Sequence, residues 1–235
     1  MPKNKLIIII VQGIVNILLV GLFAYLFVYT SKGQIILNKA KIHPHTLSWN
    51  NEVEKHLLYS TNKNKQSIVM LGNSITYECE WNELLKRPDV INRGIPGDMV
   101  KSMLNRSQDL LLGPRNTVVL MAGINDILYG NEPTAFINDY YNLILFLAKT
   151  SKPIVMSTLY TANNINANKR VDELNELIKH FCNEQGILWI DLNKHLATNN
   201  KLRLYYTYDG VHLNGPAYTI WANLIMPHLP PVNLE

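Results

Sequence analysis

The chain has 235 residues, of which 47% are hydrophobic, and its formal net charge is +4 at pH 7. This length and hydrophobic content are enough for one globular domain with its own core, plus an additional segment. The lysine and arginine residues are scattered along the sequence, which argues against nucleic-acid binding. The two cysteines, Cys79 and Cys182, have no zinc-type spacing, so we expect no metal site. Two free thiols are favoured over one long-range disulfide between them.

An uncharged apolar segment runs from residue 6 to residue 29. As a helix it would be roughly 36 Å long, which is enough to cross a hydrocarbon core of about 30 Å. The segment ends without the small residues of a signal-peptidase site, so we predict an uncleaved transmembrane anchor over residues 1–30. Basic residues flank both of its ends and leave the orientation nearly balanced. The short basic tail before the apolar run resembles a signal anchor, so we expect a single-pass membrane protein with an extracytoplasmic domain.

The rest of the chain divides into a connection and a main domain. Residues 31–64 are largely polar, with one candidate amphipathic helix over residues 47–59. From residue 65 to residue 230, short and mostly continuous apolar runs alternate with helix-like segments, as expected of parallel strands covered on both faces. This alternation predicts a three-layer α/β/α domain with a five-stranded parallel sheet. The predicted strands are 68–71, 90–91, 118–121, 154–156 and 187–190, and the predicted helices are 98–112, 133–149, 167–185 and 215–228.

Polar segments follow four of the predicted strands. Ser74 follows the first strand, residues 92–98 follow the second, residues 122–126 follow the third, and residues 208–214 come after the fifth. Ligands of open parallel sheets bind beyond the carboxyl ends of the strands. We therefore expect these segments to meet at one edge of the sheet. Taken alone, a serine after a glycine at a strand end is more often a turn residue than a nucleophile.

The polar segments contain the groups that an acyl-transfer site needs. A serine hydroxyl is a poor nucleophile unless a base takes its proton, and a neutral imidazole can do so. Asp209 precedes His212 by three residues, so one turn can bring its carboxylate to the ring Nδ1 while Nε2 faces Ser74. The alternative for this segment is a loop with an Asx turn and a surface histidine.

The developing oxyanion needs hydrogen-bond donors. The candidates are the main-chain amides of Ser74 and Gly97 and the side-chain amide of Asn125, each worth roughly 2.7–4 kcal/mol in the transition state. Helix entry at Gly97 and a helix cap at Asn125 are the alternatives. Position 76 is Thr, which disfavours the G-x-S-x-G elbow of ordinary α/β-hydrolases. Three aromatic residues are candidates for the pocket lining, with ordinary packing as the alternative: Tyr77, Trp81 and Tyr208.

Together, the four segments resemble the SGNH (GDSL-type) hydrolase family of esterases and lipases. The resemblance covers about residues 65–228, with Asn73 standing where the family has an aspartate. It implies a flavodoxin-like sheet, Ser74 as nucleophile, His212 as base and Asp209 as the residue that orients it. It also implies that Ser74, Gly97 and Asn125 form the oxyanion hole. The blocks that carry it are Gly72-Asn73-Ser74, residues 92–98, Gly123-Ile124-Asn125-Asp126 and Asp209-Gly210-Val211-His212.

The detailed pattern is similar to the bacterial branch that resembles platelet-activating-factor acetylhydrolase, which implies a preference for short acyl groups. We therefore expect a serine esterase that needs no metal or cofactor and hydrolyses carboxylic esters, such as acetyl esters, of a small molecule, glycan or lipid. A lipase or lysophospholipase, an acyltransferase and a non-catalytic binding module are the alternatives. The sequence leaves the natural substrate and the oligomeric state open.

Overall fold

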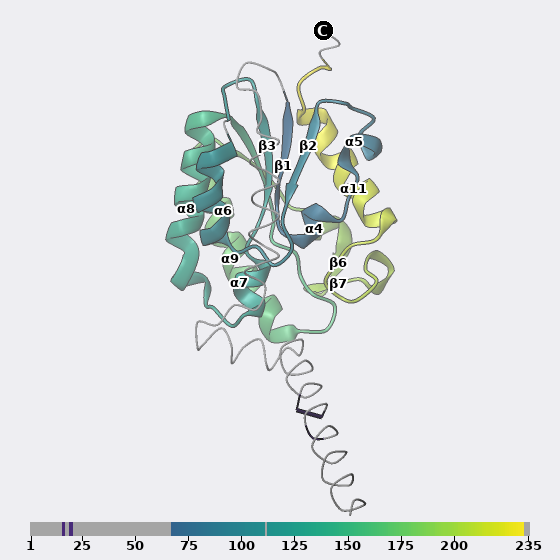
Figure 1. The fold of residues 1–235 in the computed structure, drawn as a ribbon. Helices are drawn as coiled ribbons and strands as arrows, with labels where there is room; N and C mark the ends of the chain where they lie inside the picture. The colour runs from purple at the N-terminus through teal and green to yellow at the C-terminus, as the bar shows by residue number, and fades with distance from the viewer. Residues whose placement is uncertain (1–15, 17–18, 21–66, 111, 233–235) are drawn as a thin grey trace, which may run out of the picture. The chain divides into compact units, whose positions relative to one another are not determined.

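The computed structural model describes residues 16, 19–20, 67–110 and 112–232 (Figure 1). The chain divides into two compact units, Met1–Thr46 and Leu47–Glu235. Three residues of the first unit, Asn16, Leu19 and Val20, are described and are helical. The rest of the predicted anchor, the connection and the candidate helix at 47–59 lie outside the described residues. Within the described part of the chain, no helix combines the length and hydropathy needed to span a bilayer.

A five-stranded parallel sheet forms the centre of the second unit, as predicted. The strand order is β2-β1-β3-β4-β5, and β1 and β3 are buried along their whole length. Gly72 at the end of β1 pairs with Met121 at the end of β3, so the segments after these two strands start side by side. The strands are β1 (Ile68–Gly72), β2 (Val90–Gly94), β3 (Thr117–Met121), β4 (Lys152–Met156) and β5 (Leu188–Ile190).

Helices cover both faces of this sheet, which confirms the predicted α/β/α layers (Figure 1). One side carries α6 (Val100–Ser107), α8 (Pro133–Thr150) and α9 (Ile165–Glu184), and the other carries α4 (Ser74–Tyr77), α5 (Trp81–Leu84) and α11 (Gly215–Ile225). Two predicted helices are shorter than expected, because α6 and α11 each end in a 3-10 turn, at Gln108–Leu110 and Met226–His228. The sequence did not predict the short elements α4, α5, α7 (Ile124–Leu128), α10 (Asn193–Leu196) and the hairpin β6–β7 (Ala197–Thr198 and Lys201–Leu202).

The long helices start where the local chemistry favours a start. Pro133 occupies the first turn of α8, where its missing N–H costs nothing. The Asn164 side chain accepts a hydrogen bond from the Ala167 amide at 3.0 Å and caps α9. One stripe of α9 is buried against the sheet and ends at Cys182. Both Cys182 and Cys79 are buried free thiols, as the sequence favoured.

An aromatic cluster joins α4, α5 and α11 on one side of the sheet. The Trp81 ring of α5 packs edge-on against Trp221 of α11, with 4.7 Å between the ring centroids. Trp81 also donates to the carbonyl of Thr76 at 2.8 Å and is only 1% exposed. Trp81 is therefore a core residue, which agrees with the ordinary packing that the sequence left open as the alternative to a lining role. From α11, the Tyr218 hydroxyl donates to the Ile75 carbonyl at 2.7 Å and so holds α4 in place.

Candidate active site

Ser74 is the first residue of α4 and follows β1 after only Asn73. The Asn73 side chain caps the helix by accepting a hydrogen bond from the Ile75 amide at 3.0 Å. An asparagine oxygen caps as well as an aspartate oxygen, which explains how this chain retains the turn without the acidic residue. Gly72 allows α4 and the end of β3 to lie close to its own backbone. A Cβ at this position would lie 2.0 Å from Thr76 Oγ1 and 2.8 Å from the Met121 carbonyl oxygen.

The structure brings the three predicted triad side chains together. The Ser74 hydroxyl lies 2.9 Å from Nε2 of His212, although 138 positions separate the two residues. The Nδ1 atom of the same ring lies 2.6 Å from Oδ2 of Asp209. With the ring proton on Nδ1, the imidazole donates to the carboxylate, and Nε2 is left to accept the proton of the serine. The contacts have the order and direction that a serine nucleophile requires.

The loop before α11 holds Asp209 in a fixed orientation. Its Oδ1 atom accepts hydrogen bonds from the amides of Val211 at 2.9 Å and His212 at 2.7 Å, which is the Asx turn that the sequence offered as an alternative. The turn and the triad contact therefore coexist, because each uses a different carboxylate oxygen. Partial burial acts to raise the pKa of Asp209, but the hydrogen bonds from His212 and from the two amides hold it below its usual value. The carboxylate stays ionised at neutral pH.

Three candidate oxyanion donors lie on the segments after β1, β2 and β3. Gly97 has φ of +78°, a conformation that favours glycine, and its amide donates no hydrogen bond within the described part of the chain. The same is true of the Ser74 amide at the start of α4. Asn125 uses one amide hydrogen to bond the Asp98 carbonyl at 2.9 Å, and an amide group carries two hydrogens. Its second hydrogen is available to a ligand.

A buried ion pair supports the segment that carries Gly97. Arg106 Nε donates to Oδ2 of Asp98 at 2.7 Å, and both side chains are almost fully buried. The same guanidinium donates to the carbonyls of Gly72 at 3.1 Å and Arg93 at 2.9 Å. Arg106 therefore connects the ends of β1 and β2 to the turn before α6. No sequence pattern predicts this contact, because Asp98 lies eight positions before Arg106 and outside α6.

Asp126 lies behind this segment and is 2% exposed. Its Oδ2 atom accepts a hydrogen bond from the Val100 amide at 3.2 Å. Burial raises the pKa of Asp126 to about 7, because the charged form has lost most of its contact with water. Asp126 therefore acts on the fold beneath the site, and we assign it no contact with a substrate.

Glu78, which sequence reasoning did not assign, lies against the triad together with the lining candidate Tyr208. Glu78 Oε1 is 3.9 Å from His212 Nε2, and Glu78 Oε2 accepts a hydrogen bond from the Tyr208 hydroxyl at 2.9 Å. The Tyr208 ring stacks on the His212 ring, with 5.8 Å between centroids. Glu78 follows Ser74 by four positions, which is about one helical turn. This spacing was the sequence signal that could have placed Glu78 beside the nucleophile. Of the aromatic residues named as lining candidates, Tyr208 lies at the site and Tyr77 is exposed beside it.

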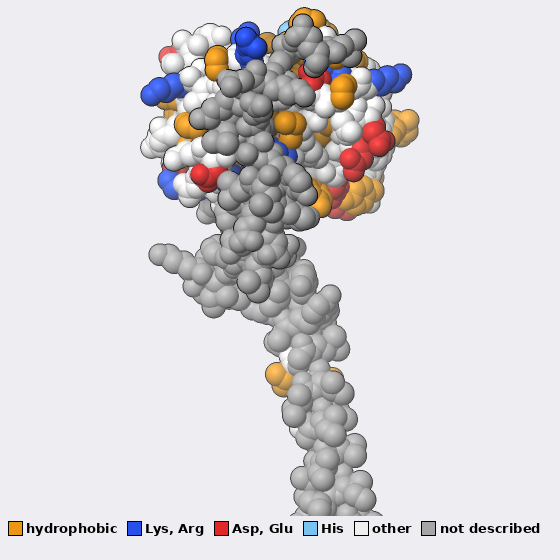
Figure 2. Space-filling view, turned by 45° about the horizontal axis from the view of Figure 1, so that its top comes forward, with side chains coloured by type: hydrophobic (Ala, Val, Ile, Leu, Met, Phe, Trp, Pro, Cys, Tyr) orange, Lys and Arg blue, Asp and Glu red, His pale blue; other side chains and the backbone are white. Residues whose placement is uncertain are grey.

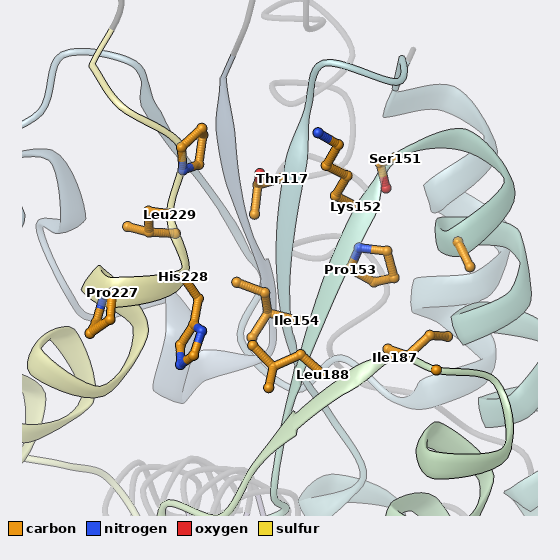
Figure 3. A pocket seen from close by; sticks show the side chains of 13 residues that line it. Thr117, Ser151, Lys152, Pro153, Ile154, Ile187, Leu188, Pro227, His228 and Leu229 are labelled. Atoms are coloured by element: carbon orange, nitrogen blue, oxygen red, sulfur yellow. The ribbon is translucent and has the colours of Figure 1, made fainter.

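The basic side chains of the described surface and a cavity at the amino ends of the strands lie outside the triad site. On the face drawn in Figure 2, the Lys and Arg side chains lie apart from one another and form no continuous basic patch. A cavity of about 590 Å³ is lined by the starts of β3 and β4, including Thr117 and Lys152, and by His228 (Figure 3). This cavity lies at the amino ends of the strands, whereas Ser74 follows the carboxyl end of β1. It is therefore not part of the triad site.

Comparison with known proteins places the chain in a family. Two solved structures share its fold: a Streptococcus pneumonia protein provisionally described as a platelet activating factor, and a GDSL-like lipase from Bacteroides thetaiotaomicron. The first is 19% identical with a TM-score of 0.70, and the alignment covers 77% of this chain and 92% of the other. The second is 23% identical with a TM-score of 0.66, and covers 77% and 96%.

Curated relatives match over a shorter stretch. An N-acylneuraminate cytidylyltransferase of Streptococcus agalactiae is 23% identical over 123 residues, which are 52% of this chain and 30% of the relative. The chain thus spans about a third of the length of the curated relatives it matches. Residues 70–220 match the model of the GDSL-like lipase/acylhydrolase family. Since this match covers more than half of the chain and includes all four segments of the site, the protein belongs to the GDSL-like lipase/acylhydrolase family.

Proposed function

We propose that the protein is a serine esterase that cleaves short-chain acyl esters through Ser74, His212 and Asp209. His212 Nε2 takes the proton of the Ser74 hydroxyl as its oxygen bonds to the ester carbonyl carbon. The negative charge that develops on the carbonyl oxygen is stabilised by the amides of Ser74 and Gly97 and by the second amide hydrogen of Asn125. Asp209 orients the imidazole and stabilises the imidazolium that forms.

Collapse of this intermediate breaks the ester bond and leaves the acyl group on Ser74. The imidazolium gives its Nε2 proton to the departing alcohol oxygen, so the alcohol leaves neutral. A water molecule then takes the place of the alcohol. His212 removes one of its protons as the water oxygen attacks the acyl carbon, and returns that proton to Ser74 Oγ as the carboxylic acid leaves.

The single observation that supports this proposal most strongly is the contact between Ser74 Oγ and His212 Nε2 at 2.9 Å, with Asp209 at 2.6 Å from the opposite ring nitrogen. A surface serine and a surface histidine have no reason to meet across 138 positions with a carboxylate behind the ring. The contact lies at the carboxyl edge of a parallel sheet, where the ligands of such folds bind.

The test is hydrolysis of p-nitrophenyl acetate by the full-length chain in detergent. Ser74→Ala removes the nucleophile and should reduce kcat by roughly 10⁴-fold or more. Ser102→Ala, on helix α6, is the matched control and should retain wild-type activity. Both variants should unfold at the wild-type temperature. Full activity of Ser74→Ala would overturn the assignment.

The acyl preference and the reaction class need separate measurements. The resemblance to the bacterial branch related to platelet-activating-factor acetylhydrolase favours acetyl over long chains, so kcat/KM for the acetate ester should exceed that for the octanoate. The reverse order would favour a lipase or lysophospholipase. If the acyl group is transferred to an added alcohol in preference to water, the enzyme is an acyltransferase. If no ester is hydrolysed, the remaining alternative is a non-catalytic binding module.

We also propose that residues 1–30 anchor the domain to a membrane, with the domain outside the cytoplasm. The support is the uncharged apolar run over residues 6–29, long enough for a membrane span. Cell fractionation should place the full chain with the membranes, and protease added to intact spheroplasts should digest the domain. A chain that stays in the soluble fraction would contradict the anchor, and protection from protease would reverse the orientation.

A further inference from the structure

Glu78 lies on the side of His212 that faces the nucleophile. Its Oε1 atom is 3.9 Å from His212 Nε2, the nitrogen that contacts Ser74. The Glu78 amide donates to the Ser74 carbonyl at 3.0 Å, so the backbone of α4 fixes the distance between the two residues. Among the described residues, no lysine or arginine lies within 4.0 Å of the Glu78 carboxylate, and its only ion-pair partner is His212. The site thus contains a second carboxylate besides Asp209.

Tyr208 holds this carboxylate in place. Its hydroxyl donates to Glu78 Oε2 at 2.9 Å, which leaves Oε1 directed at the imidazole. Partial burial of the hydroxyl and its hydrogen bond to Glu78 raise the pKa of Tyr208 to about 12, so the hydroxyl remains a donor across the working pH range of an esterase. The stacking of Tyr208 on His212 fixes the ring that carries the hydroxyl. Glu78 is therefore positioned by its partner rather than free to turn into solvent.

The mechanism determines which part of a substrate Glu78 meets. Nε2 hands its proton to the alcohol oxygen of the ester, so that oxygen must come within about 3 Å of Nε2. Given the 3.9 Å between Nε2 and Oε1, the alcohol oxygen passes within roughly 7 Å of the Glu78 carboxylate. Glu78 thus faces the alcohol portion of the ester.

A cavity continues from Glu78 and Tyr208 away from the triad. Its volume is about 680 Å³, which is within the usual range for small-molecule sites. Its lining combines three carboxylate side chains, Glu78, Glu80 and Glu83, with apolar side chains such as Leu84 and Leu213. Ionised carboxylates accept hydrogen bonds and donate none, so they can bind hydroxyl groups of a ligand whose carbon atoms contact the apolar side chains.

From this geometry, and on the basis of the function proposed above, we propose that Glu78 is a specificity-determining residue that selects esters of alcohols with hydroxyl or cationic groups over esters of anionic alcohols. Hydroxyl groups on the alcohol donate to the Glu78 carboxylate and to the cavity lining. An alcohol that carries a phosphate, sulfonate or carboxylate would place like charges within a few ångströms of each other and is rejected. A cationic alcohol is attracted by the same field.

The test is a charge series of acetyl esters with nearly equal shape. The alcohols are choline, which is cationic, 3,3-dimethylbutanol, which is its neutral counterpart, and isethionate, which is anionic. In the wild type, kcat/KM should fall in that order. Glu78→Gln preserves the size of the side chain and an oxygen that can accept from Tyr208, and should reduce the choline-to-isethionate ratio by roughly 10-fold, because only the charge is lost.

Two variants serve as controls. Glu78→Asp retains the charge and should keep the wild-type order. Glu173→Gln removes an exposed charge from α9 on the opposite face of the sheet and should leave the ratio unchanged. If Glu78→Gln does not fold, the Asp variant and Tyr208→Phe still test the proposal, since loss of the hydroxyl releases Glu78 and should lower the ratio at least threefold.

A second arm measures the hydroxyl groups. For a mono-acetylated methyl glucoside, Glu78→Gln should raise KM at least fivefold relative to the acetate of 3,3-dimethylbutanol. A wild type that hydrolyses all three charged and neutral esters with equal kcat/KM, or a Gln variant with an unchanged ratio, would overturn the role of Glu78 while the esterase function stands. A wild type that turns over none of the esters would overturn both.

Discussion

The side-chain amide of Asn125 donates to the main-chain carbonyl of Asp98 at 2.9 Å and thereby links the segment after β3 to the segment after β2. This hydrogen bond uses one of the two amide hydrogens and leaves the other available to a ligand. It also fixes the turn that carries Gly97, because Asp98 follows Gly97 directly. Asn125 is therefore both a candidate oxyanion donor and a support for the turn that carries another candidate donor, Gly97.

Asn125→Asp should lower kcat by about 100-fold or more, since it replaces a donor with a negatively charged acceptor at the place where negative charge develops. KM should change less than kcat, because the hydrogen bond strengthens in the transition state. Steady-state kinetics with p-nitrophenyl acetate measure both. Asn131→Asp, an exposed position just after α7, is the matched control and should stay near wild type. A loss below threefold in Asn125→Asp would mean that the residue is structural.

Asp209→Asn tests the third member of the triad. The amide can still accept the hydrogen bonds of Val211 and His212 through its oxygen, so the loop should persist. An NH₂ group facing Nδ1 would favour the ring tautomer with its proton on Nε2, which cannot take the proton of Ser74. We expect kcat to fall roughly 10⁴-fold with little change in the unfolding temperature. Activity within tenfold of wild type would show that His212 needs no carboxylate partner.

The sequence predicted the elements whose signals are local. Continuous apolar runs such as residues 68–71 favour covered strands, and Pro133 favours the first turn of the helix that it opens. The cap at Asn164 was not predicted, and α9 begins two residues before the predicted start at residue 167. The triad residues were identified because parallel strands bring their carboxyl ends to one edge, so order along the chain translates into position in space. That rule predicts which segments lie near one another, but it does not predict the distances between their side chains.

Contacts that depend on packing could not be predicted in this way. Trp81 lies beside the active-site segment in sequence, yet its ring turns into the core because Trp221 and Tyr218 of α11 cover it. Glu78 meets His212 only because α4 and the loop before α11 are adjacent, which no periodicity encodes. The Arg106–Asp98 pair requires the turn between them to be known first.

Arg106→Met tests that buried pair. The substitution keeps much of the apolar volume and removes the cation, so the Asp98 carboxylate loses a buried ion-pair partner 2.7 Å away. Breaking such a pair costs roughly 3–5 kcal/mol of unfolding free energy, which chemical denaturation can measure. Lys101→Met removes an exposed pair with Asp139 and should cost under about 1 kcal/mol. Equal effects of the two variants would contradict a special role for the buried pair.

Asp126 gives the domain a pH dependence of stability with a defined sign. Its pKa in the folded state is about 7, whereas an ordinary aspartate in the unfolded chain titrates near 3.9. Between these values the folded state binds more protons than the unfolded state, so the contribution of Asp126 to stability decreases as pH rises from about 4 to 7. Above the folded-state pKa the loss is complete and constant.

Asp126→Asn should remove this contribution. The amide keeps an oxygen that can accept the hydrogen bond from Val100, while the charge that burial disfavours is gone. The variant should therefore gain on the order of 1–3 kcal/mol over the wild type at pH 8 and little at pH 4. Urea denaturation at both pH values measures the difference, with Asp109→Asn as a control for an exposed carboxylate in the turn after α6. A difference between Asp126→Asn and wild type that is the same at pH 4 and pH 8 would mean that Asp126 does not titrate in the folded protein over this range.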